Sequence, residues 1–383
     1  MDALNRRHFL QLSSLSAGIA LPRVAFAAAP AATAEDRRVR LNGDGLGLTP
    51  LEYSALVHRL IEEHGIAPDS YSLGGIVEQL EDECARALGK ERAIFMPTGT
   101  LANHMAVRAL AGGASRVIVQ EQSHLYQDEG DCAQTLSNLT LMPLAPGRAT
   151  FTADEVQRLL DETKAARVVS RVSAISIETP VRRKQGARFD PVELKKIIAI
   201  ARRDGIRLHL DGARLFLESA YSGDNVAEYC RPFDTVYVSL YKYFNAASGA
   251  VLAGPREIID GMYHGRRMFG GGLNHVWPFA LVAHHYFNGF GERYTRAVTA
   301  SEEWIAKLQR HERFTIERIP LGTNLFRVQA RGVDPEAFRT RLEASGVLLG
   351  PAQDGRFLVG VNETLNRTTA TALTDAFVQA LKA

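Results

Sequence analysis

An aspartate and a lysine that each close a short apolar run stand out in this sequence because together they could carry chemistry. Asp211 ends the run over residues 207–211, and Lys242 ends the run over residues 235–242, thirty-one positions later. A buried carboxylate and a buried amine suit pyridoxal phosphate (PLP). The lysine would hold the aldehyde as a Schiff base, and the aspartate would keep the pyridine nitrogen protonated. The alternative is two ordinary strand ends, each finished by a polar residue.

A candidate phosphate site lies upstream of this pair. Thr98-Gly99-Thr100 joins an apolar run at residues 92–96 to a helical pattern that begins at Leu101. The free N–H groups and the dipole at the start of a helix favour a phosphate, and glycine lets the backbone approach closely. By itself this segment reads as a plain turn. Beside Lys242 and Asp211 it becomes the third part that a PLP site requires.

Three further polar residues are candidates for the same site. His124 follows a strand predicted at residues 116–119 and could stack flat on a pyridine ring; otherwise it is a solvated loop histidine. Glu129 is a candidate general base, because a partly buried carboxylate can hold a raised pKa; otherwise it is a surface charge among acidic neighbours. Arg356 opens a strand and could bind a substrate carboxylate in a bidentate fork; otherwise it is a surface arginine.

The elements that must position these residues follow an alternating order. Strands are predicted at residues 92–96, 116–119, 173–177, 207–211 and 250–253, and a further strand leads to Lys242. Helices are predicted at residues 76–88, after the capping box of Thr152 and Glu155, and at residues 191–203. This order predicts an α/β fold with a mostly parallel sheet covered by helices. From residue 314, short strands at 314–319, 324–328 and 356–361 flank helices at 335–345 and 369–382. We therefore expect a large domain over residues 41–305 and a small α+β domain over 306–383.

The N-terminus has the pattern of an export signal. Residues 1–27 have a basic start, an apolar middle and a small-residue end, and residues 5–10 (Asn-Arg-Arg-His-Phe-Leu) resemble a twin-arginine signal. The apolar part, residues 9–20, is too short to span a bilayer. The alternative is a chance Arg-Arg before a helix. The signal predicts a periplasmic protein with no membrane segment after cleavage, and residues 28–40 then form a flexible leader.

The charge and the cysteine content of the chain indicate which kinds of partner to expect. The chain has 383 residues and a formal net charge of +2, and its basic residues are spread along the sequence, so we expect no nucleic-acid partner. Cys84, Cys132 and Cys230 do not have the spacing of a metal site, and no metal is predicted. They allow at most one disulfide plus a free thiol, or three packed core thiols.

Two segments and several supporting positions resemble a known family. Residues 93–103 (Ala-Ile-Phe-Met-Pro-Thr-Gly-Thr-Leu-Ala-Asn) and 209–214 (His-Leu-Asp-Gly-Ala-Arg) are similar to the threonine aldolases, in the β-eliminating lyase superfamily of fold-type I PLP enzymes. Support comes from Gly74-Gly75, from His124 with Glu129, and from Gly270-Gly271-Gly272-Leu273. The resemblance runs from about Leu41 to the C-terminus.

This resemblance implies a fold-type I PLP-dependent transferase fold, a homodimer or homotetramer with active sites built across an interface, and a set of residue roles. The roles are a Schiff base at Lys242, a contact with the ring nitrogen at Asp211, stacking on the ring at His124, phosphate binding at Thr98, Gly99 and Thr100, and binding of the substrate carboxylate at Arg214 and Arg356.

The implied reaction is retro-aldol cleavage of a β-hydroxy-α-amino acid, such as threonine or allo-threonine, to glycine and an aldehyde. A base takes the β-hydroxyl proton, with Glu129 or a water near His124 as candidates. Two alternatives stay open: β-elimination to a keto acid and ammonia, and a PLP-fold binding protein without turnover. The sequence also departs from the family pattern. Glu178-Thr179-Pro180 replaces the usual Glu-Asn-Thr-His, which removes a histidine expected at the substrate hydroxyl and leaves bulkier β-hydroxy acids open as substrates.

Overall fold

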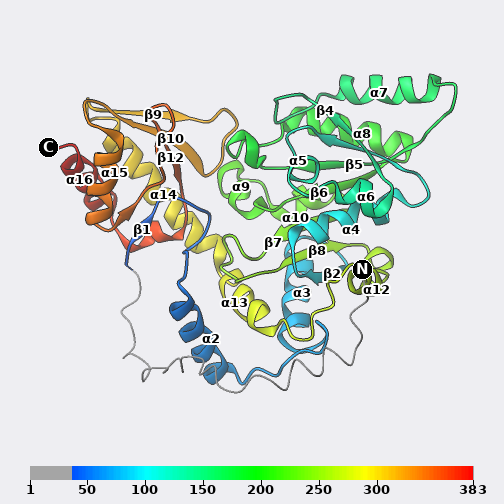
Figure 1. The fold of residues 1–383 in the computed structure, drawn as a ribbon, viewed down its shortest axis with the longest axis horizontal. Helices are drawn as coiled ribbons and strands as arrows, with labels where there is room; N and C mark the ends of the chain where they lie inside the picture. The colour runs from blue at the N-terminus through cyan, green and yellow to red at the C-terminus, as the bar shows by residue number, and fades with distance from the viewer. Residues whose placement is uncertain (1–36, 383) are drawn as a thin grey trace, which may run out of the picture. The chain divides into compact units, whose positions relative to one another are not determined.

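A seven-stranded sheet is the largest sheet in the described part of the chain, residues 37–382 of a computed structural model (Figure 1). The predicted signal, residues 1–27, lies outside the described residues. β8 runs antiparallel to both of its neighbours, and the other adjacent pairs are parallel. The predicted mostly parallel sheet is therefore confirmed. The strand order is β2 (Arg92–Met96), β8 (Ala250–Gly254), β7 (Thr235–Ser239), β6 (Arg207–Asp211), β5 (Val172–Glu178), β3 (Arg116–Gln120) and β4 (Thr140–Leu144).

Helices cover both faces of this sheet, because successive side chains of a strand point to opposite faces. In β2, Phe95 joins the core formed with one set of helices, whereas Ile94 and Met96 join the core on the other face. The first set comprises α2 (Pro50–His64), α3 (Gly75–Ala87), α7 (Ala153–Ala165), α8 (Pro191–Asp204), α9 (Leu215–Ser222), α10 (Val226–Cys230) and α13 (Trp277–Phe287). The second comprises α4 (Gly99–Ala111), α5 (His124–Gln127), α6 (Cys132–Ser137), α11 (Arg256–Ile259) and α12 (Met262–Met268).

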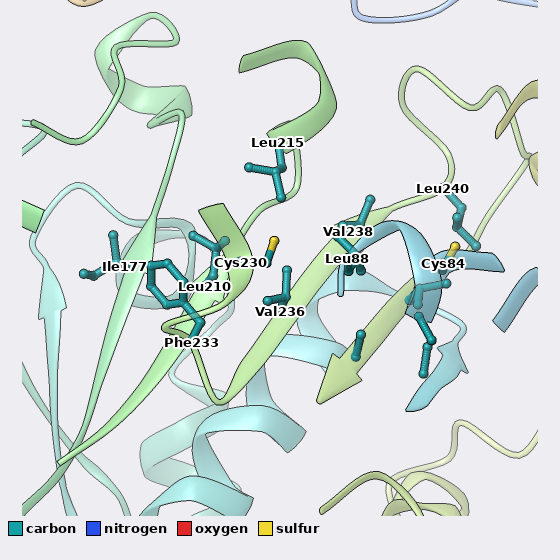
Figure 2. Packing of buried hydrophobic residues seen from close by; sticks show 14 of the residues in the cluster. Cys84, Leu88, Ile177, Leu210, Leu215, Cys230, Phe233, Val236, Val238 and Leu240 are labelled. Atoms are coloured by element: carbon teal, nitrogen blue, oxygen red, sulfur yellow. The ribbon is translucent and has the colours of Figure 1, made fainter. Parts of the chain in front are cut away.

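Two of the three cysteines belong to the first of these cores. Figure 2 shows Cys84 and Cys230 among apolar side chains such as Leu88 and Val236. Both cysteines are buried and all three are free thiols, while Cys132 is half-buried. The prediction of packed core thiols is thus confirmed for Cys84 and Cys230, and Cys132 differs because it sits next to Glu129 rather than in an apolar core.

A separate core, the C-terminal core, lies in the last part of the chain. The antiparallel sheet β12 (Phe357–Gly360), β10 (Leu325–Ala330), β9 (Phe314–Arg318) packs with α14 (Phe290–Leu308), α15 (Pro335–Ala344) and α16 (Ala370–Ala380). Trp304 of α14 is fully buried there, with its ring 5.0 Å from that of Phe377. The predicted boundary near residue 305 therefore falls inside a helix that contributes to this core.

The beginning of the described chain also belongs to the C-terminal core. β1 (Val39–Arg40) pairs in parallel with β11 (Val347–Leu348), and Val39 and Leu41 are buried. Residues 39 and 40 therefore form a strand and do not belong to the flexible leader predicted for residues 28–40. The physical reason is that two apolar side chains find a place in a core more than 300 positions away in sequence.

Side-chain caps explain where several helices begin. Thr152 and Glu155 form the predicted capping box of α7, and the Asp190 carboxylate accepts the N–H of Val192 and of Glu193 at the start of α8. Thr98 caps α4 by accepting the N–H of Leu101 at 3.1 Å, so this helix begins at Gly99, two residues before the predicted start. Between residues 37 and 382, no helix combines the length and the apolar character needed to cross a membrane.

Candidate active site

A cavity of about 1150 Å³ opens at the carboxyl ends of the central strands, the edge at which open α/β sheets bind ligands. Its walls come from the ends of β5 and β6, the start of α4, the segment at residues 40–53 and the loop after β7. Most of the predicted site residues line it: Thr98, Gly99, Thr100, His124, Asp211, Arg214 and Lys242. Glu129 and Arg356 do not.

Asp211 and Lys242 reach this cavity from different kinds of structure. Asp211 is the last residue of β6, as predicted, and is 3% exposed. β7 ends at Ser239, so Lys242 lies on the following loop and is only half-buried, rather than a buried strand end. Its Nζ donates to Tyr241 Oη at 3.2 Å and lies 4.6 Å from the centre of that ring. The amine is thus held at the cavity wall by a neighbouring aromatic side chain.

The start of α4 provides the cradle for an anion. The first N–H groups of a helix have no intrahelical acceptor, and here they belong to Gly99 and Thr100 at the cavity wall. A Cβ atom on Gly99 would lie 2.0 Å from Tyr237 Oη, so only glycine fits beside this ring. Tyr237, in the middle of β7, also lines the cavity and was not identified from the sequence.

His124 and Glu129 form a hydrogen-bonded pair in which only the histidine faces the cavity. The Nδ1 atom of His124 lies 2.9 Å from Oε1 of Glu129, and the side chains are 34% and 0% exposed. The hydrogen bond to Glu129 raises the pKa of His124, while burial raises the pKa of Glu129. Glu129 was expected to act directly on the substrate. Glu129 lies behind His124 and does not line the cavity, and it contacts the site through its hydrogen bond to the imidazole.

Asn103, inside α4, connects this pair to Asp211. Its Nδ2 atom donates to Glu129 Oε1 and to Asp211 Oδ2, each at 2.8 Å. Asn103 is the last residue of the segment at residues 93–103 and was not among the site residues predicted from the sequence. A helical asparagine in an apolar stretch carries no sign of its partners, which follow 26 and 108 positions later.

Two acidic residues hold other parts of the wall. Asp44 accepts hydrogen bonds from Arg214, with Nη2 to Oδ2 at 2.8 Å and Nε to the two oxygens at 3.0 and 3.1 Å. Glu178, the last residue of β5, accepts the backbone N–H of His124 at 2.5 Å and of Arg182 at 2.8 Å. Burial, followed by the charge of Asp211, raises the pKa of Glu178 to about 7.

Arg356 lies away from this cavity, contrary to the expected carboxylate contact. Its Nη1 atom is 3.1 Å from Glu317 Oε2, and the side chain is 49% exposed. The reason is that Arg356 precedes β12, which begins at Phe357. Gly360 is the residue of β12 that approaches the cavity, since a Cβ there would be 3.2 Å from the carbonyl oxygen of Gly43. Arg356 is four residues earlier, which is roughly 13 Å along a strand.

The donor set of the cavity fits PLP. An amine at Lys242 can take the aldehyde, a buried carboxylate at Asp211 can hold a protonated pyridine nitrogen, and the start of α4 can bind the phosphate. Within the described residues, no cluster of three or more histidine, cysteine, aspartate or glutamate side chains could hold a metal ion.

Comparison with known proteins agrees with this geometry. The family model described as "Beta-eliminating lyase" matches residues 66–332. A low-specificity L-threonine aldolase of Candida albicans is 29% identical over 54% of this chain and 55% of its own length, so the match spans about half of that relative. Low-specificity L-threonine aldolase 1 of Arabidopsis thaliana is 25% identical over 79% of this chain and 86% of its own length. A solved structure from Listeria monocytogenes, provisionally described as an L-allo-threonine aldolase, superposes with a TM-score of 0.71 at 26% identity, covering 90% of this chain and 95% of that one.

Proposed function

The chain belongs to the beta-eliminating lyase family, and we propose that it is a PLP-dependent lyase that cleaves a β-hydroxy-α-amino acid of the threonine type into glycine and an aldehyde. The observation that carries this proposal is the single cavity shared by Lys242, Asp211 and the start of α4. The threonine aldolases among the relatives favour aldol cleavage over other reactions of PLP.

PLP, when bound, would supply an electron sink joined to the amino group of the substrate. The chain would hold it by three contacts: Lys242 at the aldehyde, Asp211 at the pyridine nitrogen, and the N–H groups of Gly99 and Thr100 at the phosphate. The low polarity around Asp211, which is 3% exposed, strengthens a charge-assisted hydrogen bond there.

Arg214 would orient the substrate by binding its carboxylate. Asp44 engages Nε and Nη2 of this arginine, which leaves Nη1 as the nitrogen that can turn toward a ligand. Because the guanidinium is already fixed by Asp44, it loses little further freedom on binding. A fixed carboxylate sets which bond at Cα lies perpendicular to the pyridine ring, and therefore which bond breaks.

His124 would take the proton of the β-hydroxyl group. Its Nδ1 atom faces Glu129, so Nε2 is the nitrogen available to the cavity. Glu129 stabilises the imidazolium that forms when this proton arrives, because the carboxylate accepts the Nδ1–H. The raised pKa of His124 agrees with such a role, since it makes the neutral ring a stronger base.

The reaction is tested by identifying the products formed from L-threonine, L-allo-threonine and phenylserine. The expected products are glycine and the corresponding aldehyde, with loss of turnover in Lys242→Ala. Lys196→Ala is the matched control, since Lys196 is a helix-surface lysine paired with Glu193, and it should retain activity.

The other products decide between the remaining classes. A keto acid with ammonia would assign the protein to the eliminating lyases and overturn aldol cleavage. Neither product, together with no PLP absorbance in the purified protein, would leave a binding protein of this fold and would refute both enzymatic assignments.

We also propose that the protein is exported to the periplasm by the twin-arginine route. Support comes from residues 1–27 of the sequence alone. Fractionation and N-terminal sequencing test the proposal. The expected mature protein begins after residue 27, and replacing Arg6 and Arg7 by lysine should retain the precursor in the cytoplasm. A full-length periplasmic protein, or export that does not depend on the two arginines, would contradict it.

We further propose a homodimer or homotetramer. Leu73 and Met268 are exposed apolar side chains at 54% and 65%, and the neighbouring loops are joined by the hydrogen bond from Tyr71 N to Asn274 O. Exposed apolar groups of this kind favour burial against another subunit. Light scattering after size exclusion measures the mass; a monomer at all concentrations would contradict the proposal.

A further inference from the structure

Asn103 lies between two carboxylates that come from separate parts of the fold. Its side chain is 1% exposed, and its two amide hydrogens point to Asp211 at the end of β6 and to Glu129 after α5. Both donor–acceptor distances are 2.8 Å. A single side chain therefore spans the distance between the carboxylate at the cavity wall and the carboxylate behind His124.

The neighbours of Asn103 determine which way its amide points. Carboxylate oxygens accept hydrogen bonds, so the NH₂ group must face them, and Oδ1 then accepts the Nε2–H of His209 at 3.0 Å. The other ring nitrogen of His209, Nδ1, lies 2.9 Å from the hydroxyl oxygen of Thr235. Burial lowers the pKa of His209 to about 4, which agrees with a neutral ring that carries one hydrogen.

The same Glu129 oxygen receives a second donor. His124 Nδ1 lies 2.9 Å from Oε1, the atom that Asn103 also contacts. Fixing this oxygen therefore fixes the plane of the imidazole that lines the cavity. One continuous path of hydrogen bonds runs from Thr235 through His209, Asn103 and Glu129 to His124, and Asp211 branches from it at Asn103.

We propose that Asn103 is a positioning residue, which joins Asp211 and the Glu129–His124 pair into one hydrogen-bonded unit. Asp211, which holds the pyridine nitrogen, and the imidazole of His124, which accepts the proton, then keep a constant position relative to each other. This inference rests on the proposed function, because the roles of Asp211 and His124 come from it. Asn103 itself does not line the cavity and acts through its partners.

The surroundings of the two carboxylates define what a pH experiment would report. The titratable groups that face Glu129 or Asp211 are His124, Cys132, Glu178, His209 and Tyr237. Glu178 and His124 also have raised pKa values, Glu178 through burial and the charge of Asp211 and His124 through its hydrogen bond to Glu129, so the pH dependence reports this linked group of residues rather than Glu129 alone. The hydrogen bond from Asn103 lowers the pKa of Glu129 against the raising effect of burial.

The first test measures the stability of the cofactor-free protein with Asn103→Ala at several pH values. Removing the donor raises the pKa of Glu129 further above its ordinary value, and a raised folded-state pKa means that stability is lost as pH rises through it. The loss relative to wild type should therefore be larger at about pH 8 than at about pH 5. Val107→Ala, a buried apolar truncation on the same helix, is the control and should show a constant loss. A constant loss for Asn103→Ala as well would overturn the proposal.

The second test needs no variant, so it tests the hydrogen-bonded linkage through Asn103 even if Asn103→Ala does not fold. Nitrogen-15 NMR of labelled wild-type protein, without cofactor, reports the tautomer of each histidine ring. We expect hydrogen on Nε2 of His209 and on Nδ1 of His124. Hydrogen on Nδ1 of His209 would require the opposite amide orientation and would refute the linkage. Neither measurement involves PLP or turnover, so failure of the proposed reaction would be visible separately, in the product analysis.

Discussion

Gly99→Ala should damage the candidate site without any change in its charge. A Cβ atom at this position would lie 2.0 Å from Tyr237 Oη and 2.6 Å from Cζ, whereas an ordinary contact begins at 3.4 Å. Tyr237 is 3% exposed in the middle of β7, so its ring has little room to retreat. The helix start must then move by about 1.4 Å, the difference between the two contact distances.

The expected cost has two parts. Overpacking of this kind destabilises a protein by about 1–3 kcal/mol. A displacement on the order of 1 Å in a positioning element can reduce activity on the order of 100-fold, and here it moves the N–H groups of Gly99 and Thr100. The assay is PLP affinity by absorbance titration together with the thermal midpoint. We expect weaker PLP binding and a lower midpoint.

Two further variants sharpen this experiment. Gly113→Ala is the matched control, because a Cβ there meets no atom within 4 Å, and it should leave both quantities unchanged. Tyr237→Phe in the Gly99→Ala background lengthens the nearest contact from 2.0 to 2.6 Å and should restore part of the affinity. Wild-type PLP affinity in Gly99→Ala would refute the claim that the start of α4 holds the phosphate.

Three other predictions concern charged residues. Glu129→Gln should lower the pKa of His124 toward 6.5. Because the folded-state pKa of His124 is raised, its pair with Glu129 stabilises the protein most below about pH 6.5, and this contribution fades as pH rises. For a side chain that is one-third exposed, we expect the variant to lose about 1 kcal/mol of unfolding free energy at the acid end. Denaturation that shows the same loss at all pH values would contradict this prediction. Arg214→Ala should raise KM for the amino acid by about 10- to 100-fold with a smaller change in kcat, the cost of a hydrogen-bonded charge, and an unchanged KM would remove Arg214 from substrate binding. Arg356→Ala should leave KM unchanged and should change the free energy of unfolding by no more than about 1 kcal/mol, since its pair with Glu317 is exposed. A large rise in KM would restore the role expected from the sequence.

The parts of the fold that depend on local pattern were predictable. The capping box at Thr152 and the N-cap at Asp190 begin helices where expected, because capping requires only residues within three positions. Asp211 was found because an apolar run that ends on a carboxylate is visible in the sequence itself. Such features need no knowledge of tertiary packing.

The features that were missed depend on contacts between distant positions. Asn103 meets Asp211 and Glu129 only when α4 packs on the sheet, and nothing near Asn103 in sequence announces those partners. Arg356 was assigned from its residue type and neighbours, but β12 begins only at Phe357, so Arg356 precedes the strand, and Glu317 supplies its counter-charge. A residue type predicts what chemistry is available, whereas strand register and helix packing decide where it is used.

The attachment of the cofactor at Lys242 is the central claim, and borohydride reduction tests it most directly. The purified protein, loaded with PLP, is reduced, digested and mapped by mass spectrometry. We predict that the reduced pyridoxyl group is found on the peptide that contains Lys242, and that Lys242→Ala carries none. A pyridoxyl group on a different lysine, or the same labelling in Lys242→Ala, would contradict the account of this cavity.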